Sequence, residues 1–160
     1  MTASLIDLAV FLCALGSGLM AGFFFAFSIC VMRALGAIQP AHGISAMQSI
    51  NVVVINRWFL TPFFGVALLC LLLIIAAVLR WPEPGTACVL AGGLLYVAGT
   101  FLVTILFNVP RNNALAAVAA TSPEGAAQWA DYLIVWTRWN HVRTVAALAG
   151  AASFMIALTR

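Results

Sequence analysis

Long stretches without a charged residue limit what this chain can fold into more than any other feature of its sequence. Three of them, residues 8–32, 58–79 and 84–110, each exceed the roughly 20 residues that a helix needs to cross the hydrocarbon core of a bilayer. A fourth, residues 144–159, would form about 24 Å of helix, which is slightly short by itself. The pattern predicts an all-α integral membrane protein with four spans, folded as a four-helix bundle in one domain over residues 1–160.

The composition argues against other classes. The chain is 65% hydrophobic and 7% charged, whereas about a quarter of the residues in a soluble domain are charged. A soluble helical bundle would need a charged outer face on each helix. A transmembrane barrel would need short strands of alternating polarity instead of continuous apolar runs. Residues 8–32 follow no basic segment and are too long for a signal peptide, so we expect the protein to retain them.

The arginines, in a chain without lysine, lie mostly at the ends of the apolar stretches. Those in or beside the first and third loops are Arg33, Arg57, Arg111, Arg138 and Arg143, while Arg80 and Arg160 lie on the other side. The basic excess predicts that loops one and three face the cytoplasm, in a bacterial inner membrane. The net charge of +3 therefore marks membrane edges, and no nucleic-acid partner is predicted. A homo-oligomer is compatible with this sequence.

The segment between the first two spans is too long for a simple turn. Pro40 can begin a helix, and apolar or amide side chains follow it at helical spacing: Ile44, Met47, Asn51, Val54 and Trp58. We therefore predict an amphipathic helix between helices one and two. It would either cover a pocket or rest on the lipid surface.

The last helix carries a polar and aromatic face. Ser122 and Pro123 are typical of an N-cap and a first helical position, so the helix would run over residues 123–158, about 53 Å. One face would hold residues three or four apart, namely Tyr132, Trp136, Trp139, Asn140 and Arg143. Aromatic residues alone are typical of membrane-interface anchors. An asparagine and an arginine on the same face favour a polar pocket inside the bundle instead.

A second polar cluster, NVPRNN at 108–113, ends the third apolar stretch. The amides of Asn108 and Asn112 would either satisfy backbone groups freed by Pro110 or point into a cavity. Pro110 is expected to bend or end the helix. Asn51 and Asn56 of the first loop emerge on the same side of the membrane. Polar side chains from three separate segments thus converge on one face, which indicates a site.

The residue types at this face limit its chemistry. The candidate proton acceptors are His42, His141 and Asp131. The four cysteines show no paired short spacing, so no metal site is predicted, although a histidine-ligated haem or copper is left open. The absence of a glycine-rich phosphate loop argues against a nucleotide cofactor. Arginine, asparagine and aromatic side chains together suit the oxyanion or enolate of a flat, apolar aromatic molecule.

The chain resembles the anthrone oxygenase family through a glycine-rich first helix followed by three motifs, MQSINVVVINRWF at 47–59, NVPRNNAL at 108–115 and WTRWNHVRT at 136–144. This order of features covers nearly the whole chain. The resemblance implies a four-helix membrane protein. Fungal members of that family are associated with the oxidation of anthrones to anthraquinones by dioxygen. The residues that match the family motifs are Asn56, Asn108, Pro110, Asn112, Trp136, Trp139, Asn140 and Arg143. Arg111 departs from the pattern, because an apolar residue is expected between the proline and the asparagine.

The residues and the resemblance together suggest an oxygenase or oxidase that acts on a lipophilic anthrone-like or phenolic aromatic without a cofactor. The predicted substrate contacts are Trp136, Trp139, Tyr132, Asn112 and Asn56, and the predicted catalytic residues are Arg143, Asn140, Asn108 and His141. In this hypothesis His141 or Asp131 removes a proton, and the amides and the guanidinium stabilise the enolate. The alternatives are a membrane protein that binds such a molecule without turnover and a purely structural membrane protein.

Overall fold

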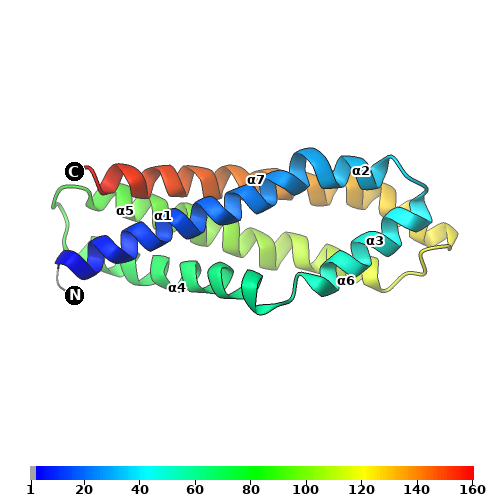
Figure 1. The fold of residues 1–160 in the computed structure, drawn as a ribbon, viewed down its shortest axis with the longest axis horizontal. Helices are drawn as coiled ribbons and strands as arrows, with labels where there is room; N and C mark the ends of the chain where they lie inside the picture. The colour runs from blue at the N-terminus through cyan, green and yellow to red at the C-terminus, as the bar shows by residue number, and fades with distance from the viewer. Residues whose placement is uncertain (1–2) are drawn as a thin grey trace.

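The computed structural model describes residues 3–160, which are entirely helices and the loops between them. The molecule is an elongated bundle whose helices run along its long axis (Figure 1). Both termini lie at one end of the bundle, and the turns that join α2 to α3 and α6 to α7 lie at the other end (Figure 1). In chain order the helices are α1 Ala3–Ala26, η1 Phe27–Val31, α2 Met32–Gly36, α3 Pro40–Val53, α4 Arg57–Leu79, α5 Thr86–Leu94, η2 Leu95–Leu102, η3 Thr104–Asn108, α6 Val109–Ala116 and α7 Pro123–Ala157.

Two of the long helices contain π-helical turns. The segments α1, η1 and α2 follow one another without a loop, as do α5, η2, η3 and α6. We predicted that Pro110 bends or ends the helix. The helix does not end there, because the chain stays helical through this proline to Ala116. π-Helical turns inside α-helices are found frequently at functional sites.

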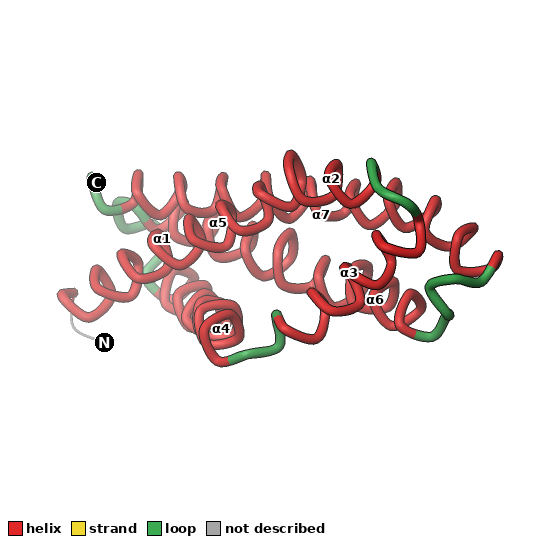
Figure 2. Tube along the Cα trace, turned by 45° about the vertical axis from the view of Figure 1, so that its right-hand side comes forward, coloured by secondary structure: helices red, strands yellow, loops and turns green. Residues whose placement is uncertain are grey.

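The predicted helix of the first loop is present as α3, with Pro40 in its first turn. α3 and α4 lie along one edge of the bundle and are separated by a break at residues 54–56, which Figure 2 shows as a loop. The Asn56 side chain caps α4, since its Oδ1 accepts from Trp58 N at 2.9 Å and Phe59 N at 3.3 Å. Its Nδ2 donates to Val53 O at 2.7 Å. Asn56 thereby fixes both sides of the break.

Glycine and alanine allow the helices to approach closely around α7. A Cβ on Gly99 of η2 would lie 2.5 Å from Ala146 Cβ, and one on Gly150 would lie 3.2 Å from Gly92 O. Two glycines of α1 that lie four residues apart have a different environment. Nothing lies within 4 Å of a Cβ built on Gly18 or Gly22, so these two do not mediate the packing.

Three helical stretches are long and apolar enough to cross a membrane, Leu5–Gly36, Arg57–Leu79 and Thr86–Ala116. Four spans were expected. Within the described chain α7 is long enough to be the fourth, but it is not among the helices whose composition is apolar enough to cross a membrane. The reason is its polar central turn, which includes Asn140 and Arg143. Both side chains are buried against the other helices.

Candidate functional site

A cavity of about 390 Å³ lies behind the break between α3 and α4; we call it the inner cavity. Its wall is mostly aromatic and aliphatic, and its polar side chains come from α3, η3, α6 and α7. The aromatic residues include Phe24, Phe27, Phe59, Phe63 and Trp136, and the polar ones include Asn51, Thr104, Asn112, Asn113 and Arg143. A few polar groups converging in an apolar cavity are typical of a binding site for a small molecule.

Arg143 places a positive charge at the wall of this cavity. Its side chain is 5% exposed, and its Nε donates to Asn140 Oδ1 at 2.9 Å. One of its terminal nitrogens, Nη1, donates to Thr104 Oγ1 at 3.2 Å. The only ion pair among residues 3–160 joins Arg80 to Glu83, so no carboxylate neutralises this guanidinium. A buried charge without a counter-ion is costly in an apolar surrounding, which favours an anion in the cavity.

Two aromatic rings flank the guanidinium. Arg143 Cζ lies 4.2 Å from the centroid of the Phe24 ring and 4.9 Å from that of Trp136. Each ring attracts the cation through its quadrupole and limits its movement. The plane of the guanidinium is therefore fixed, and the N–H groups that are not bound to Asn140 or Thr104 remain available to a ligand.

Asn140 orients Arg143 instead of lining the cavity. It is fully buried, and its Nδ2 donates to Phe24 O at 2.7 Å and to Ser28 Oγ at 2.6 Å. Its Oδ1 accepts the bond from Arg143 Nε. Because both ends of the amide are engaged by the protein, Asn140 serves as a bridge between α1, η1 and α7 that holds the guanidinium in place.

The two asparagines of α6 and η3 differ in role. Asn112 lines the inner cavity, and its Oδ1 accepts from Tyr132 OH at 2.8 Å and from Trp136 Nε1 at 2.7 Å. Asn108 does not line it. Its Nδ2 donates to Trp136 O at 3.2 Å, and its Oδ1 is buried without a partner among the described residues. Both asparagines thus fix the position of Trp136.

Several residues predicted for the site lie elsewhere. Trp139 stacks on Phe107, with ring centroids 3.7 Å apart, and does not line the inner cavity. Asn56 is the exposed cap of α4. Arg111, the departure from the family pattern, donates from Nη1 to Phe107 O at 2.7 Å and lies outside the cavity wall as well.

The candidate proton acceptors are also outside the cavity. His42, His141 and Asp131 are exposed, and none of them contributes to the wall. His141 follows Asn140 on α7, and adjacent helical residues point about 100° apart, so burial of Asn140 turns His141 outward. An acid–base role for His141 or Asp131 has no support in this arrangement.

Three contributors were not identified from the sequence, namely Phe24, Ser28 and Thr104. A signal was present, because Thr100, Thr104, Asn108 and Asn112 recur every four residues within an apolar stretch. Hydroxyl groups in a membrane helix need partners inside the protein. Thr104 Oγ1 donates to Thr100 O at 2.8 Å and, as described above, accepts from Arg143.

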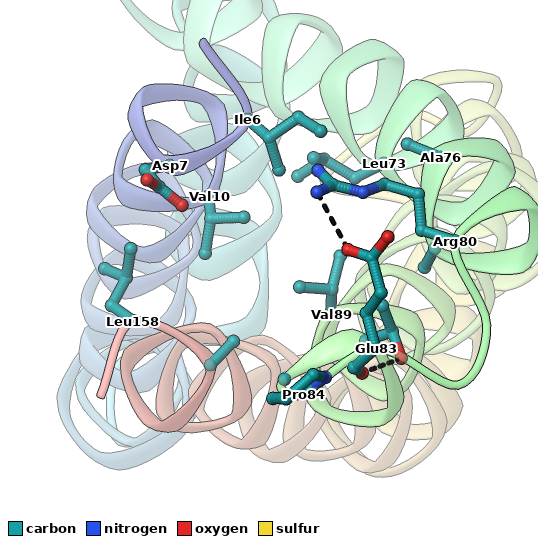
Figure 3. A pocket seen from close by; sticks show the side chains of 14 residues that line it. Ile6, Asp7, Val10, Leu73, Ala76, Arg80, Glu83, Pro84, Val89 and Leu158 are labelled. Carbon is teal, nitrogen blue, oxygen red and sulfur yellow. Dashed lines mark hydrogen bonds and ion pairs between the residues drawn. The ribbon is translucent and has the colours of Figure 1, made fainter. Parts of the chain in front are cut away.

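A smaller cavity of about 140 Å³ lies at the opposite end of the bundle, near the termini (Figure 3). Arg80 and Glu83 form their ion pair there, with Nη2 and Oε2 2.8 Å apart, and Asp7 of α1 lies across from them (Figure 3). Within residues 3–160, no three histidine, cysteine or acidic side chains are grouped as metal ligands would be. This end of the molecule shares no residue with the inner cavity.

Comparison with known protein families identifies one match. The sequence model of the anthrone oxygenase family matches residues 55–153, from the break before α4 to the last turns of α7. The matched region contains Thr104, Asn112, Trp136 and Arg143 of the inner-cavity wall. Comparisons with curated proteins and with solved structures found no match.

Proposed function

Because this chain belongs to the anthrone oxygenase family, we propose that it is a membrane oxygenase or oxidase that holds a lipophilic anthrone-like or phenolic aromatic in its inner cavity for reaction with dioxygen. The observation that carries this proposal is the buried guanidinium of Arg143, which has no carboxylate partner within residues 3–160 and lies against an aromatic wall. Such a site complements a flat apolar molecule that bears one delocalised negative charge.

The proposed location is a bacterial inner membrane, with the C-terminal half of α7 as a fourth span. Residues 144–157 would extend about 21 Å, and the bundle interior takes up Asn140 and Arg143. Polar residues that face the inside of a membrane bundle are tolerated better than residues that face lipid. The α2–α3–α6 end would face the cytoplasm, because loops one and three meet there.

The cavity wall favours the anion of such a substrate over its neutral form. A phenolate or enolate oxygen would accept from the free N–H groups of Arg143, and Trp136 would stack on the ring system. Asn112 Oδ1 accepts a hydrogen bond from Trp136 Nε1 and so holds the indole in place. Among the described residues of the wall, Arg143 is the only charged one, so no other charged side chain competes for the substrate oxygen.

The reaction needs only the enolate and dioxygen in its overall balance. An anthrone loses its methylene proton to give the enolate, and this electron-rich carbon is oxidised by one dioxygen. A C–O bond forms at that carbon to give a peroxide anion, and cleavage of its O–O bond with loss of the remaining C–H proton yields the quinone and hydroxide. The proton lost first passes to water, because the described wall holds no histidine or carboxylate. Arg143 contributes by stabilising the negative charge of the enolate.

Oxygen uptake by the purified protein with a simple anthrone tests the proposal. We expect the wild type to take up oxygen faster than a protein-free blank. After subtraction of the blank, the rate of Arg143→Ala should be at least about 100-fold lower, as for loss of an oxyanion donor. Arg138→Ala is the matched control, because Arg138 is exposed on the same helix and should keep full activity. Unfolding temperatures establish that both variants are folded. Uptake equal to the blank by the wild type would contradict an oxygenase acting on this substrate.

The absence of a proton acceptor from the described wall also favours a second candidate function, binding of the same aromatic anion without turnover. The two functions share every contact and differ only in the consumption of dioxygen. Under the second, a stable hydroxyanthraquinone would bind to the wild type and not to Arg143→Ala, while oxygen uptake stays at the blank. Binding together with uptake would exclude it.

A further inference from the structure

A second cavity of about 480 Å³ lies between α1, α3 and the first turn of α4; we call it the outer cavity. Its wall is almost wholly apolar. It includes Leu19 and Met20 of α1, Val53 of α3, and Trp58 of α4. The Asn56 amide at its edge is already engaged in capping α4. The other polar residue of the wall is Ser49, so the outer cavity offers room for an apolar molecule and, among the described residues, no charged group that would hold an ionised one.

The outer and inner cavities share part of their walls. The residues that line both are Phe23, Phe27, Ile50, Val54 and Phe59. The Phe23 ring centroid lies 5.0 Å from that of Phe59 and 5.1 Å from that of Phe27. Each of these rings is partly exposed. Rotation of a partly exposed side chain is fast compared with motion of a helix, so Phe23 and Phe59 can join the cavities without any backbone change.

The outer cavity opens on the surface that faces lipid. Its rim carries exposed apolar side chains, with Leu19 at 59%, Val53 at 69% and Trp58 at 78% exposure. The Arg57 guanidinium lies 5.0 Å from the centroid of the Trp58 ring. Tryptophan and arginine together are typical of the boundary between hydrocarbon and headgroups. A lipophilic aromatic dissolved in the bilayer would reach this rim directly.

The route past the far side of α3 is closed by hydrogen bonds. Gln48 Nε2 donates to Leu115 O at 2.9 Å and to Val118 O at 3.1 Å, which ties α3 to the end of α6. Ile44 and Met47, on the same helix, are buried against Leu115 and Trp129. Opening on this side would break two hydrogen bonds and expose a hydrophobic cluster. Opening through the phenylalanine partition costs only ring rotation.

We propose that the outer cavity is a lateral entrance through which the lipophilic aromatic passes from the bilayer to the inner cavity, with Phe23 and Phe59 as the gate. This inference rests on the proposed function, because it takes its ligand from there. It assigns α1 and α3, both of which precede the matched family region, to substrate access. The neutral molecule crosses the apolar entrance and loses its proton beside Arg143.

Blocking the rim tests the entrance. In a background with Cys30→Ala and Cys88→Ala, Val53→Cys is labelled in lipid nanodiscs with a maleimide that carries an adamantyl group. Val145→Cys is the matched control, because Val145 is a valine of 67% exposure on α7 that lines neither cavity. Stopped-flow quenching of tryptophan fluorescence by a hydroxyanthraquinone gives the association and dissociation rates without any turnover.

We expect the label at position 53 to slow association and dissociation together, by about tenfold, with Kd unchanged, since a blocked route alters both rates equally. The same label at position 145 should alter neither rate. Unchanged rates at position 53, or a weaker Kd without slower association, would overturn the entrance while the site in the inner cavity stands. If the unlabelled protein bound no hydroxyanthraquinone, the proposed function and the entrance would both fail.

A gate variant provides a second, opposite test. Phe23→Ala shortens a side chain of the partition and should speed association by about threefold or more. Phe25→Ala is its control, because Phe25 is 53% exposed and lines neither cavity. Equal association and dissociation rates for Phe23→Ala and the wild type would show that Phe23 is not part of the gate.

Discussion

At the scale of single residues, the site depends on how one buried cation is held. Arg143 is bound by Asn140 and Thr104 and flanked by Phe24 and Trp136, so four neighbours from α1, η3 and α7 itself determine where its charge lies. No carboxylate of the described residues neutralises the guanidinium, so a ligand would have to supply the negative charge. The side chains around Arg143 therefore divide into those that touch the cavity and those, such as Asn140, that position the guanidinium.

Asn140→Ala should be among the most harmful single substitutions. It removes the acceptor of Arg143 Nε and the donor to Phe24 O and Ser28 Oγ, all of them buried. We expect a loss of about 1–3 kcal/mol in the free energy of unfolding for each buried group left unpaired. Thermal unfolding in detergent measures this loss. A variant as stable as the wild type would contradict the bridging role.

His141→Ala should leave oxygen uptake and ligand binding unchanged, since His141 is exposed and outside the cavity wall. Asp131→Asn should behave in the same way for the same reason. Steady-state rates over a range of pH measure both. A loss of rate for either variant, with the unfolding temperature preserved, would indicate that the substituted side chain acts as a base in the reaction.

At the scale of elements, the break between α3 and α4 creates the site. The run of β-branched residues in NVVVIN at 51–56 is unfavourable for a helix, and Asn56 then caps the new helix that follows. The break leaves space behind it, and Asn51, Val54 and Phe59 line that space. The π-helical turns of η2 and η3 lie opposite and carry Thr104 towards Arg143.

Asn56→Ala should destabilise the protein by about 0.5–2 kcal/mol through loss of the α4 cap. It should also raise hydrogen exchange at the amides of Trp58 and Phe59, whose bonds to Asn56 Oδ1 are lost. Asn56→Asp is the control, because a carboxylate accepts the same two bonds. If both variants exchanged equally fast, capping would not be what holds the break.

At the scale of the whole molecule, the sequence predicted the general architecture better than it predicted the site. Uncharged stretches are long-range features set by the bilayer, so the all-helical membrane fold, the loop helix α3 and the start of α7 at Pro123 were predictable. Of the five residues predicted to share one helical face, Tyr132, Trp136, Asn140 and Arg143 are buried, whereas Trp139 is partly exposed. Which buried residue touches a cavity depends on neighbouring helices, and one sequence does not reveal that pairing.

The closest helix contacts illustrate the same limit. Gly18 and Gly22 lie four residues apart, a spacing typical of close helix contacts, yet they are uncrowded, whereas Gly99 is crowded. Gly99→Ala should therefore destabilise the bundle by about 1–3 kcal/mol, because its Cβ would lie 2.5 Å from Ala146 Cβ. Gly22→Ala should be neutral or slightly stabilising, since nothing lies within 4 Å of its Cβ. Unfolding temperatures in detergent compare the two, and the reverse order would contradict the packing.

The central claim is that Arg143 holds an aromatic anion inside the membrane protein, and the absorbance of a bound hydroxyanthraquinone tests it most directly. Phenol and phenolate absorb at different wavelengths, so a pH titration gives the midpoint of ionisation of the bound ligand. A nearby guanidinium stabilises the phenolate, and we expect a midpoint about one pH unit or more below that of the ligand in protein-free nanodiscs. The shift should vanish in Arg143→Gln and persist in Arg138→Gln. A bound ligand that ionises at the same pH as the free one, or at a higher pH, would contradict the claim.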